Sequence, residues 1–280
     1  MTDAQWKLVF DQQGVTIASD KFQFTTNATR QQDDAGLDFE QQMAINSAES
    51  SYMEAVISQL QTMTRRTYGQ YCGLSRAIEV VGERWSPMII RDLLVRPKSF
   101  HELNQGFPSA STDILSARLG ELEHSGVVRQ VQDTDGETRY RLTAFGRDLD
   151  DAMIRLGRWG ARLLGAPRPE DVATNDSVRM ALRTMFDPEA AAGIQVSYQL
   201  NLDDIVVHAR IDDGVIETGE GPLAGADLVL EPGETLMPML TGELSAAEAI
   251  ATGSLKYFGD PALVALFTEL FKIDPMPVDS

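Results

Sequence analysis

The feature of the sequence that most constrains its fold is a series of short amphipathic helices followed at once by a β-hairpin, in the middle third of the chain. Apolar residues at three- and four-residue spacing predict the helices. Local signals predict where each one begins or ends. Gly82 breaks the first helix, the second ends before Pro97, and Ser99 with Glu102 forms a capping box for a short third helix that ends at Pro108.

A fourth helix and the hairpin complete this pattern. Residues 111–124 carry one apolar face, formed by Ile114, Leu115, Leu119 and Leu122, and Gly126 is typical of a helix stop. Asp135-Gly136 predicts the turn of a hairpin over residues 127–142. Two helices, a tight turn and a hairpin in this order predict a winged helix-turn-helix domain, closed by one further helix over 144–164.

The polar face of the 111–124 helix suits DNA. A major groove about 12 Å wide admits one helix, whose short polar side chains near its N-terminus read base edges. The candidate contacts on the helix are Ser111, Thr112, Ser116 and Arg118, and the hairpin adds Arg129, Arg139 and Arg141. Ser and Thr bond bases or phosphate, and Arg bonds guanine or phosphate. The alternative is a three-helix core with an ordinary solvated Ser/Thr face.

Charge is distributed unevenly along the chain. The formal net charge of −18 argues against nucleic acid when taken alone, because phosphate repels a negative surface. Residues 63–168, however, hold 16 of the 24 basic residues and 13 acidic ones, a net charge of +3, while residues 169–280 carry −15. A basic block beside acidic ones indicates that one domain meets a polyanion. Drift in surface charge is the alternative.

Three segments in the same order carry a family resemblance: CGLSRAIEVVGERWSPMIIRDLL, SFHEL and STDILSARLGELEHSGVV. Together they resemble the HxlR-type family of winged-helix regulators. The resemblance implies a DNA-binding domain over residues 63–165 with Ser111–His124 as recognition helix. It also implies a homodimeric transcription factor that binds double-stranded DNA, with small-molecule or redox input. The acidic sequence QDTDGE at the wing tip departs from what DNA contact requires, which leaves Arg139 and Arg141 on the returning strand.

Cys72 is the chain's one cysteine, so neither an intrachain disulfide nor a cysteine-based zinc site is expected. Members of the resembled family often carry a cysteine near the first helix, and some use it to sense oxidants or electrophilic carbonyls. A thiolate at a helix N-terminus would have a lowered pKa and raised reactivity, which Arg65, Arg66 and Arg76 could assist. The alternative is a small buried apolar side chain.

Residues 170–275 predict a second, α+β domain. A helix comes first, strand-like runs follow at 194–200, 204–211 and 226–230, and two helical stretches flank a short strand near 254–257. The segment DDGVIETGEGP is expected to supply turns. This order of elements favours a sheet with helices packed on one face.

The end of that segment, MPMLTGELSAAEAIATGSLKYFGDPALVALFTELF, is similar to the closing part of sterol-carrier-like lipid-binding domains. The resemblance implies an apolar tunnel between sheet and helices and therefore an apolar small-molecule effector. The candidate pocket residues are Met237, Met239, Leu240, Phe258, Leu263, Phe267 and Phe271. The alternative is that these residues simply form the core of the domain.

Residues 1–62 fit neither resemblance. Alternation in WKLVFDQQGVTIASDKFQF predicts two short strands around a turn near Gly14, and residues 37–63 predict one amphipathic helix. The segment is either an upstream extension before a start at Met63 or an arm for dimerisation or interaction. Both alternatives stay open at this point.

The expected fold class is α+β: a winged helix-turn-helix domain, a sterol-carrier-like domain and an unassigned N-terminal extension. The sequence holds no Ser-His-Asp set, phosphate loop, paired-carboxylate motif or metal-ligand spacing, so we expect no enzyme, no cofactor and no metal. It also shows no secretory signal or membrane span, which predicts a cytoplasmic protein.

Two functions are weighed. The first is a homodimeric DNA-binding regulator, expected to be a repressor, in which Trp159, Leu156 and Leu163 help to join the dimer mate. The alternative is a carrier of lipid or another apolar ligand whose winged helix mediates protein contacts. Salt dependence distinguishes them, because binding through phosphate weakens steeply with salt and uptake of an apolar ligand does not.

Overall fold

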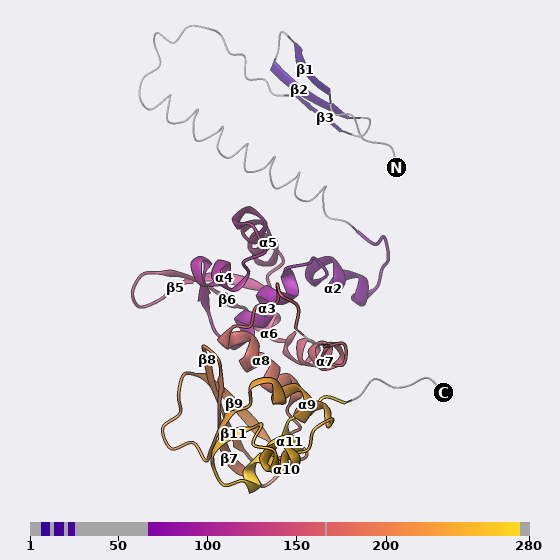
Figure 1. Ribbon diagram of the computed structural model, residues 1–280. Coiled ribbons are helices and arrows are strands. Elements are labelled where there is room, and N and C mark those ends of the chain that lie inside the picture. The colour runs from indigo at the N-terminus through magenta and orange to yellow at the C-terminus, as the bar shows by residue number, and fades with distance from the viewer. Residues whose placement is uncertain (1–6, 12–13, 20–21, 26–66, 166, 275–280) are drawn as a thin grey trace, which may run out of the picture. The chain divides into compact units, whose positions relative to one another are not determined.

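The computed structural model describes residues 7–11, 14–19, 22–25, 67–165 and 167–274 (Figure 1). The chain divides into two compact units, residues 1–66 and residues 67–280. In the first unit, β1 (Lys7–Asp11), β2 (Gly14–Ser19) and β3 (Phe22–Thr25) form an antiparallel sheet in that order. The prediction of two strands here was one strand short, because four residues are too few for alternation to stand out. The predicted helix over 37–63 lies outside the described residues.

The second unit begins with the predicted series of helices. They are α2 (Gly73–Val81), α3 (Ser86–Val95), α4 (Phe100–Gly106) and α5 (Thr112–His124), with the two-residue strand β4 (Lys98–Ser99) before α4. The capping box predicted at Ser99 and Glu102 is present. Ser111 caps α5 by accepting a hydrogen bond from the backbone N–H of Ile114. Gly126 follows α5 with a φ of 75°, the left-handed conformation in which glycine ends helices.

The hairpin follows α5 as predicted. Strands β5 (Val128–Gln132) and β6 (Thr138–Leu142) are antiparallel, and β4 pairs with β6 on the other side. Gly136 has a φ of 77° in the turn. The helices and the wing close over one buried cluster: Ile89, Ile90, Leu93, Leu103, Phe107, Ala110, Leu115, Leu119, Leu122, Val127, Val128 and Leu142. This cluster fixes the position of α5.

The single closing helix predicted over 144–164 is wrong, because the structure has two helices, α6 (Ala144–Arg147) and α7 (Asp150–Ala161). The short α6 is held against the start of the wing. Thr143 Oγ1 donates to the Gly126 carbonyl at 2.6 Å and accepts from the backbone N–H of Gly146. A Cβ at Gly146 would stand 2.1 Å from the Val127 carbonyl oxygen. Asp148 and Leu149 form the turn between α6 and α7.

The C-terminal half is a five-stranded sheet with helices. It begins with α8 (Asn175–Met185) and continues with β7 (Gln195–Leu202), β8 (Ile205–Asp212), β9 (Val215–Glu220), β10 (Leu228–Glu231), α9 (Leu236–Thr241), α10 (Ala246–Ala251), β11 (Lys256–Gly259) and α11 (Ala262–Leu270). The strand order is β11-β10-β7-β8-β9, with β10 parallel to β7 and the other pairs antiparallel. A short 3-10 turn, Gly233–Thr235, precedes α9.

The sheet has one buried face. Tyr198 on β7 and Phe267 on α11 are fully buried, with ring centroids 5.3 Å apart, and alternate residues of β7 and β8 share this burial. The segment DDGVIETGEGP supplies a turn as expected, and it also contains β9, which was not predicted. Asp213 and Gly214 both have positive φ and form the two-residue turn of the β8–β9 hairpin.

Helix α8 links the two hydrophobic clusters of the second unit, since it contacts α3 and α7 as well as β8 and β9. Gly157 allows the close approach of α7, because a Cβ there would lie 3.0 Å from Thr184 Cγ2 on α8. No helix in the part of the chain that the structure describes is long and apolar enough to cross a membrane.

Candidate nucleic-acid interface

Helix α5 buries one face and exposes the other. Leu115, Leu119 and Leu122 are buried in the cluster beneath it, as predicted. Three of the candidate DNA contacts, Ser111, Thr112 and Ser116, are exposed at its N-terminal half. Ile114, expected on the buried face, is 45% exposed instead and lies in the first turn of the helix. The exposed face therefore begins with short polar side chains and one isoleucine.

Arg118 lies on α5 between two carboxylates. Its Nη1 is 2.5 Å from Glu121 Oε2 and 3.6 Å from Glu83 Oε2. Both glutamates are about half exposed, 52% and 49% of their side chains. Exposed pairs of this kind are worth only about 0–1 kcal/mol, so a phosphate or a base can replace the glutamate without a large cost.

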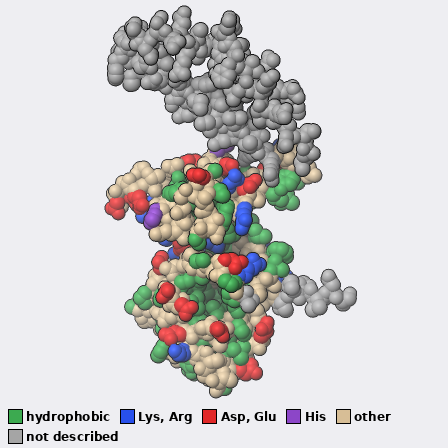
Figure 2. All heavy atoms as spheres, turned by 45° about the horizontal axis from the view of Figure 1, so that its top comes forward, with side chains coloured by type: hydrophobic (Ala, Val, Ile, Leu, Met, Phe, Trp, Pro, Cys, Tyr) green, Lys and Arg blue, Asp and Glu red, His purple; other side chains and the backbone are tan. Residues whose placement is uncertain are grey.

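The wing separates its three candidate arginines into two groups. Arg129 on β5 and Arg141 on β6 are cross-strand partners, and among the described residues neither forms an ion pair. Arg139 differs, because Asp133, Glu102 and Glu137 hold its guanidinium at 2.7, 2.9 and 2.7 Å. Assigning Arg139 to DNA does not fit this geometry, since its donors are already committed within the wing. Acidic side chains gather at the wing tip (Figure 2), as QDTDGE indicates.

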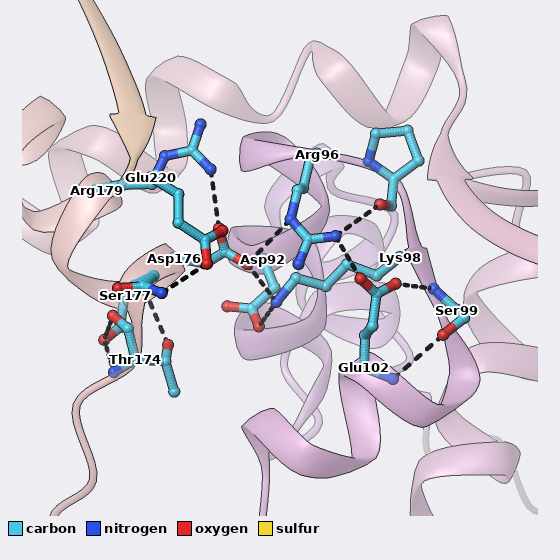
Figure 3. Close-up of polar contacts among 12 residues, drawn as sticks. Asp92, Arg96, Lys98, Ser99, Glu102, Thr174, Asp176, Ser177, Arg179 and Glu220 are labelled. Carbon is cyan, nitrogen blue, oxygen red and sulfur yellow. Dashed lines mark hydrogen bonds and ion pairs between the residues drawn. The ribbon is translucent and has the colours of Figure 1, made fainter. Parts of the chain in front are cut away.

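A chain of ion pairs runs from the wing to α8, and Figure 3 shows its part from Glu102 to Asp176. Glu102 binds Arg139 at 2.9 Å and Arg96 at 2.7 Å, and Arg96 lies 3.6 Å from Asp176 on α8. Lys98 on β4 is buried between Asp92 and Asp176 and is 2.7 Å from each. Sequence reasoning missed this cluster. The available signal was Asp92 inside the apolar run MIIRDLL, a position where a carboxylate needs a partner.

The pKa of the Glu102 carboxyl reflects its place between Arg96 and Arg139. Partial burial raises the pKa of the Glu102 carboxyl, but the backbone N–H of Ser99, the Arg96 hydrogen bond and the charges of Arg96 and Arg139 outweigh it and lower the pKa to about 2. Hydrogen bonding by Arg139 likewise lowers the pKa of Asp133. Both carboxylates are thus charged at neutral pH and hold Arg139 in the wing.

A cavity of about 450 Å³ lies along α8. Three of the predicted pocket residues, Met237, Leu240 and Phe267, line it. The other four predicted residues do not line this cavity: Met239 and Phe271 are buried in the core, Leu263 packs against that core, and Phe258 is 64% exposed on the edge strand β11. Neighbouring strand residues face opposite ways, and Tyr257 takes the inward position beside Phe258.

Comparison with known proteins identifies the DNA-binding half. A model of the HxlR-like helix-turn-helix family matches residues 80–167. The HTH-type transcriptional regulator YodB of Bacillus subtilis is 34% identical over 88 residues, which cover 31% of this chain and 79% of that protein. The chain belongs to the HxlR-like helix-turn-helix family.

Two further similarities involve a curated protein and a solved structure. An uncharacterized HTH-type transcriptional regulator of Mycobacterium tuberculosis is 38% identical over 112 residues, which cover 39% of this chain. The match spans 66% of the mycobacterial protein, about two thirds of its length. The reduced form of YodB from B. subtilis, a solved structure, is 27% identical and has a TM-score of 0.31, covering 35% of this chain and all of that one. These relatives are named as transcriptional regulators, which are not enzymes.

The HxlR-like match runs from the end of α2 to just beyond α7, so Cys72 and the C-terminal half lie outside it. Cys72 is an exposed free thiol at the N-cap of α2, and the alternative of a buried apolar cysteine is therefore excluded. The backbone N–H groups of Ser75 and Leu74 lower the pKa of the Cys72 thiol. Arg76, expected to assist, is paired with Glu79 at 2.7 Å, and Arg65 and Arg66 lie outside the described residues.

Proposed function

We propose that this chain is a cytoplasmic, homodimeric transcriptional repressor that binds double-stranded DNA through α5 and is controlled by an apolar small molecule. The observation that carries the proposal is the geometry of α5. Its leucine face is buried, and Ser111, Thr112 and Ser116 are exposed together at its N-terminal half. This is the part of a recognition helix that contacts base edges in the major groove.

The proposed contacts differ in kind. Ser111, Thr112 and Ser116 bond bases or phosphate, Arg118 reaches guanine or phosphate after leaving Glu121, and Ile114 packs on a thymine methyl group. Arg129 and Arg141 contact phosphate, which positions the protein without reading sequence. Arg139 is assigned to the wing's internal structure, because three carboxylates hold it there.

The proposed dimer rests on exposed apolar residues of α7 and its C-terminal end. Leu156, Trp159 and Leu163 are 53%, 60% and 59% exposed. Side chains of this size on one surface are typical of a contact with another chain. A two-fold dimer places two copies of α5 in successive major grooves about 34 Å apart. Occupancy of a promoter by such a dimer represses without any contact to polymerase.

Two inputs are proposed. Residues 170–275 form an effector domain of the sterol-carrier-like kind, supported by its helix-covered sheet and by the cavity along α8. Cys72 is a sensor of oxidants, supported by its exposure and its lowered pKa. An effector changes DNA binding only through different affinities for the two forms of the dimer.

A mobility-shift assay with DNA that flanks the chain's own coding region tests the proposal. We expect a specific complex that forms at low salt, weakens as salt rises, and carries two chains per duplex. A matched duplex with scrambled sequence is the control. Absence of any specific complex at low salt, together with tight uptake of an apolar ligand, would favour the carrier function instead.

A further inference from the structure

The cavity along α8 has walls from both halves of residues 67–274. Pro87 and Met88 of α3 and Gly160 of α7 form one side, and Met237 and Leu240 of α9 with Phe267 of α11 form the other. We infer that this cavity binds an uncharged apolar small molecule that contacts the DNA-binding half and the C-terminal half at once. The predicted pocket lay within the C-terminal half alone, so the helix-turn-helix wall is new.

The lining residues suit a ligand of variable shape. Small residues line the cavity where α7 faces α8: Gly157, Gly160, Ala161 and Ala181. Five of the chain's eleven methionines also line it: Met88, Met153, Met180, Met185 and Met237. Methionine is unbranched and polarizable, so a wall rich in it adapts to different apolar partners.

The polar groups of the lining indicate an uncharged ligand. Ser177 Oγ donates to the Thr174 carbonyl at 2.9 Å, and Thr184 Oγ1 donates to the Met180 carbonyl at 2.8 Å. Arg91 is the one charged residue of the described lining, and its Nε and Nη2 donate to Asp92 Oδ1. Because these side chains already have partners, a charged ligand would lose its hydration without regaining equivalent bonds.

The size of the cavity selects a small molecule over a protein segment. Its volume of about 450 Å³ falls within the range of about 300–1,000 Å³ typical of small-molecule sites. A second copy of the chain would need a broad surface, since stable interfaces bury about 800 Å² on each partner. The residues lining the cavity converge on one site between elements of the same chain.

The site deepens the proposed function, and its role in regulation rests on that function. A ligand between α7 and α8 contacts the helix-turn-helix half directly, so its binding depends on how the two halves are arranged. The binding test below contains no DNA. Its failure is therefore distinguishable from a failure of DNA binding.

The experiment titrates the full-length chain with N-phenyl-1-naphthylamine, an uncharged dye whose fluorescence rises in apolar surroundings. Two variants fill the cavity from opposite sides of the α7–α8 contact, Ala161→Phe on α7 and Ala181→Phe on α8. Ala247→Phe is the matched control, because Ala247 is exposed on α10 and does not line the cavity. Thermal melting of each variant verifies that it folds. Dodecanol and dodecanoate then compete with the dye as an uncharged and a charged ligand of equal chain length.

We expect saturable binding to the unmodified chain and to Ala247→Phe, and binding weakened by about tenfold or more in both cavity variants. Dodecanol should displace the dye at lower concentration than dodecanoate. Binding that Ala161→Phe leaves unchanged would overturn the shared site in favour of a pocket in the C-terminal half. Absence of saturable binding or preference for dodecanoate would overturn the inference as well.

Discussion

Lys98 Nζ lies 2.7 Å from Asp176 Oδ2, an ion pair that joins β4 of the winged helix to α8 of the C-terminal half. Both side chains are only 5% exposed. Asp176 also forms ion pairs with Arg179 at 3.0 Å and with Arg96 at 3.6 Å (Figure 3). A single carboxylate thus balances several cations at the contact between the two halves.

Asp176→Asn should destabilise the chain by about 3 kcal/mol, because it leaves buried cations without their shared carboxylate. Urea unfolding measures this change. Asp150→Asn is the matched control. Asp150 forms an ion pair with Arg183 at 2.7 Å, and this pair is more exposed than that of Asp176 with Lys98. That change should cost no more than about 1 kcal/mol. Equal losses in the two variants would contradict the account of the cluster.

Arg118→Ala should weaken specific DNA binding by about 1–3 kcal/mol and leave the unfolding free energy nearly unchanged, because its ion pairs are exposed. Fluorescence anisotropy with a labelled duplex measures the affinity. Arg210→Ala provides the control, since Arg210 is exposed on β8 of the C-terminal sheet. Native stability with unchanged DNA affinity would remove Arg118 from the interface.

The wing arginines should separate into two classes. Arg129→Ala and Arg141→Ala should each reduce the slope of log K against log salt by about 2, because the proposed dimer loses one phosphate contact in each subunit. Arg139→Ala should instead lower stability with little change in that slope, because it removes the partner of Glu102 and Asp133. An Arg139 variant that folds normally but loses a phosphate contact would reverse this assignment.

Acid should weaken the fold through Glu102. Its pKa is about 2 in the folded chain and 4.5 for an ordinary glutamate, so the folded state binds the proton less well. The stabilisation is therefore complete above about pH 4.5 and is lost as the pH falls toward 2. Unfolding across this window should show a steeper loss for the natural chain than for Glu102→Gln. Parallel pH profiles would contradict the lowered pKa.

The Cys72 thiol should react with iodoacetamide at a lower pH than a free cysteine thiol, because backbone N–H groups of α2 lower its pKa. The pH profile of alkylation gives the midpoint, with the urea-unfolded chain as reference. Cys72→Ser should abolish any response of DNA binding to diamide. A full response in that variant would end the sensor proposal.

The helices around α5 could be predicted from the sequence because each carried its own local signal. Ser99 with Glu102 marked one start, and Gly126 marked the end of α5. The break between α6 and α7 at Asp148 and Leu149 carries no glycine or proline, so no local signal in the sequence marked it. Strand β9 was missed although Asp213-Gly214 gave the hairpin turn, since its residues are only partly buried and alternate weakly.

The sequence predicted which residues of the candidate site are exposed, but it did not predict which residues pair with one another. Exposed Ser111 and Ser116 follow from the periodicity of α5. That Arg139 is held by three carboxylates depends on Glu102, 37 residues earlier in the chain, which no local pattern links to it. The helix-turn-helix wall of the cavity likewise depends on how α7 packs on α8, a tertiary contact that the sequence does not encode locally.

The central claim is that α5 and the wing bind DNA, and the salt dependence of that binding tests it most directly. Anisotropy with the flanking duplex should show affinity falling by about 10³ or more between about 50 and 200 mM salt, as expected when several phosphates are contacted. Affinity for a scrambled duplex should be weaker at every salt concentration. Binding that does not change with salt, or does not distinguish the two duplexes, would contradict the account.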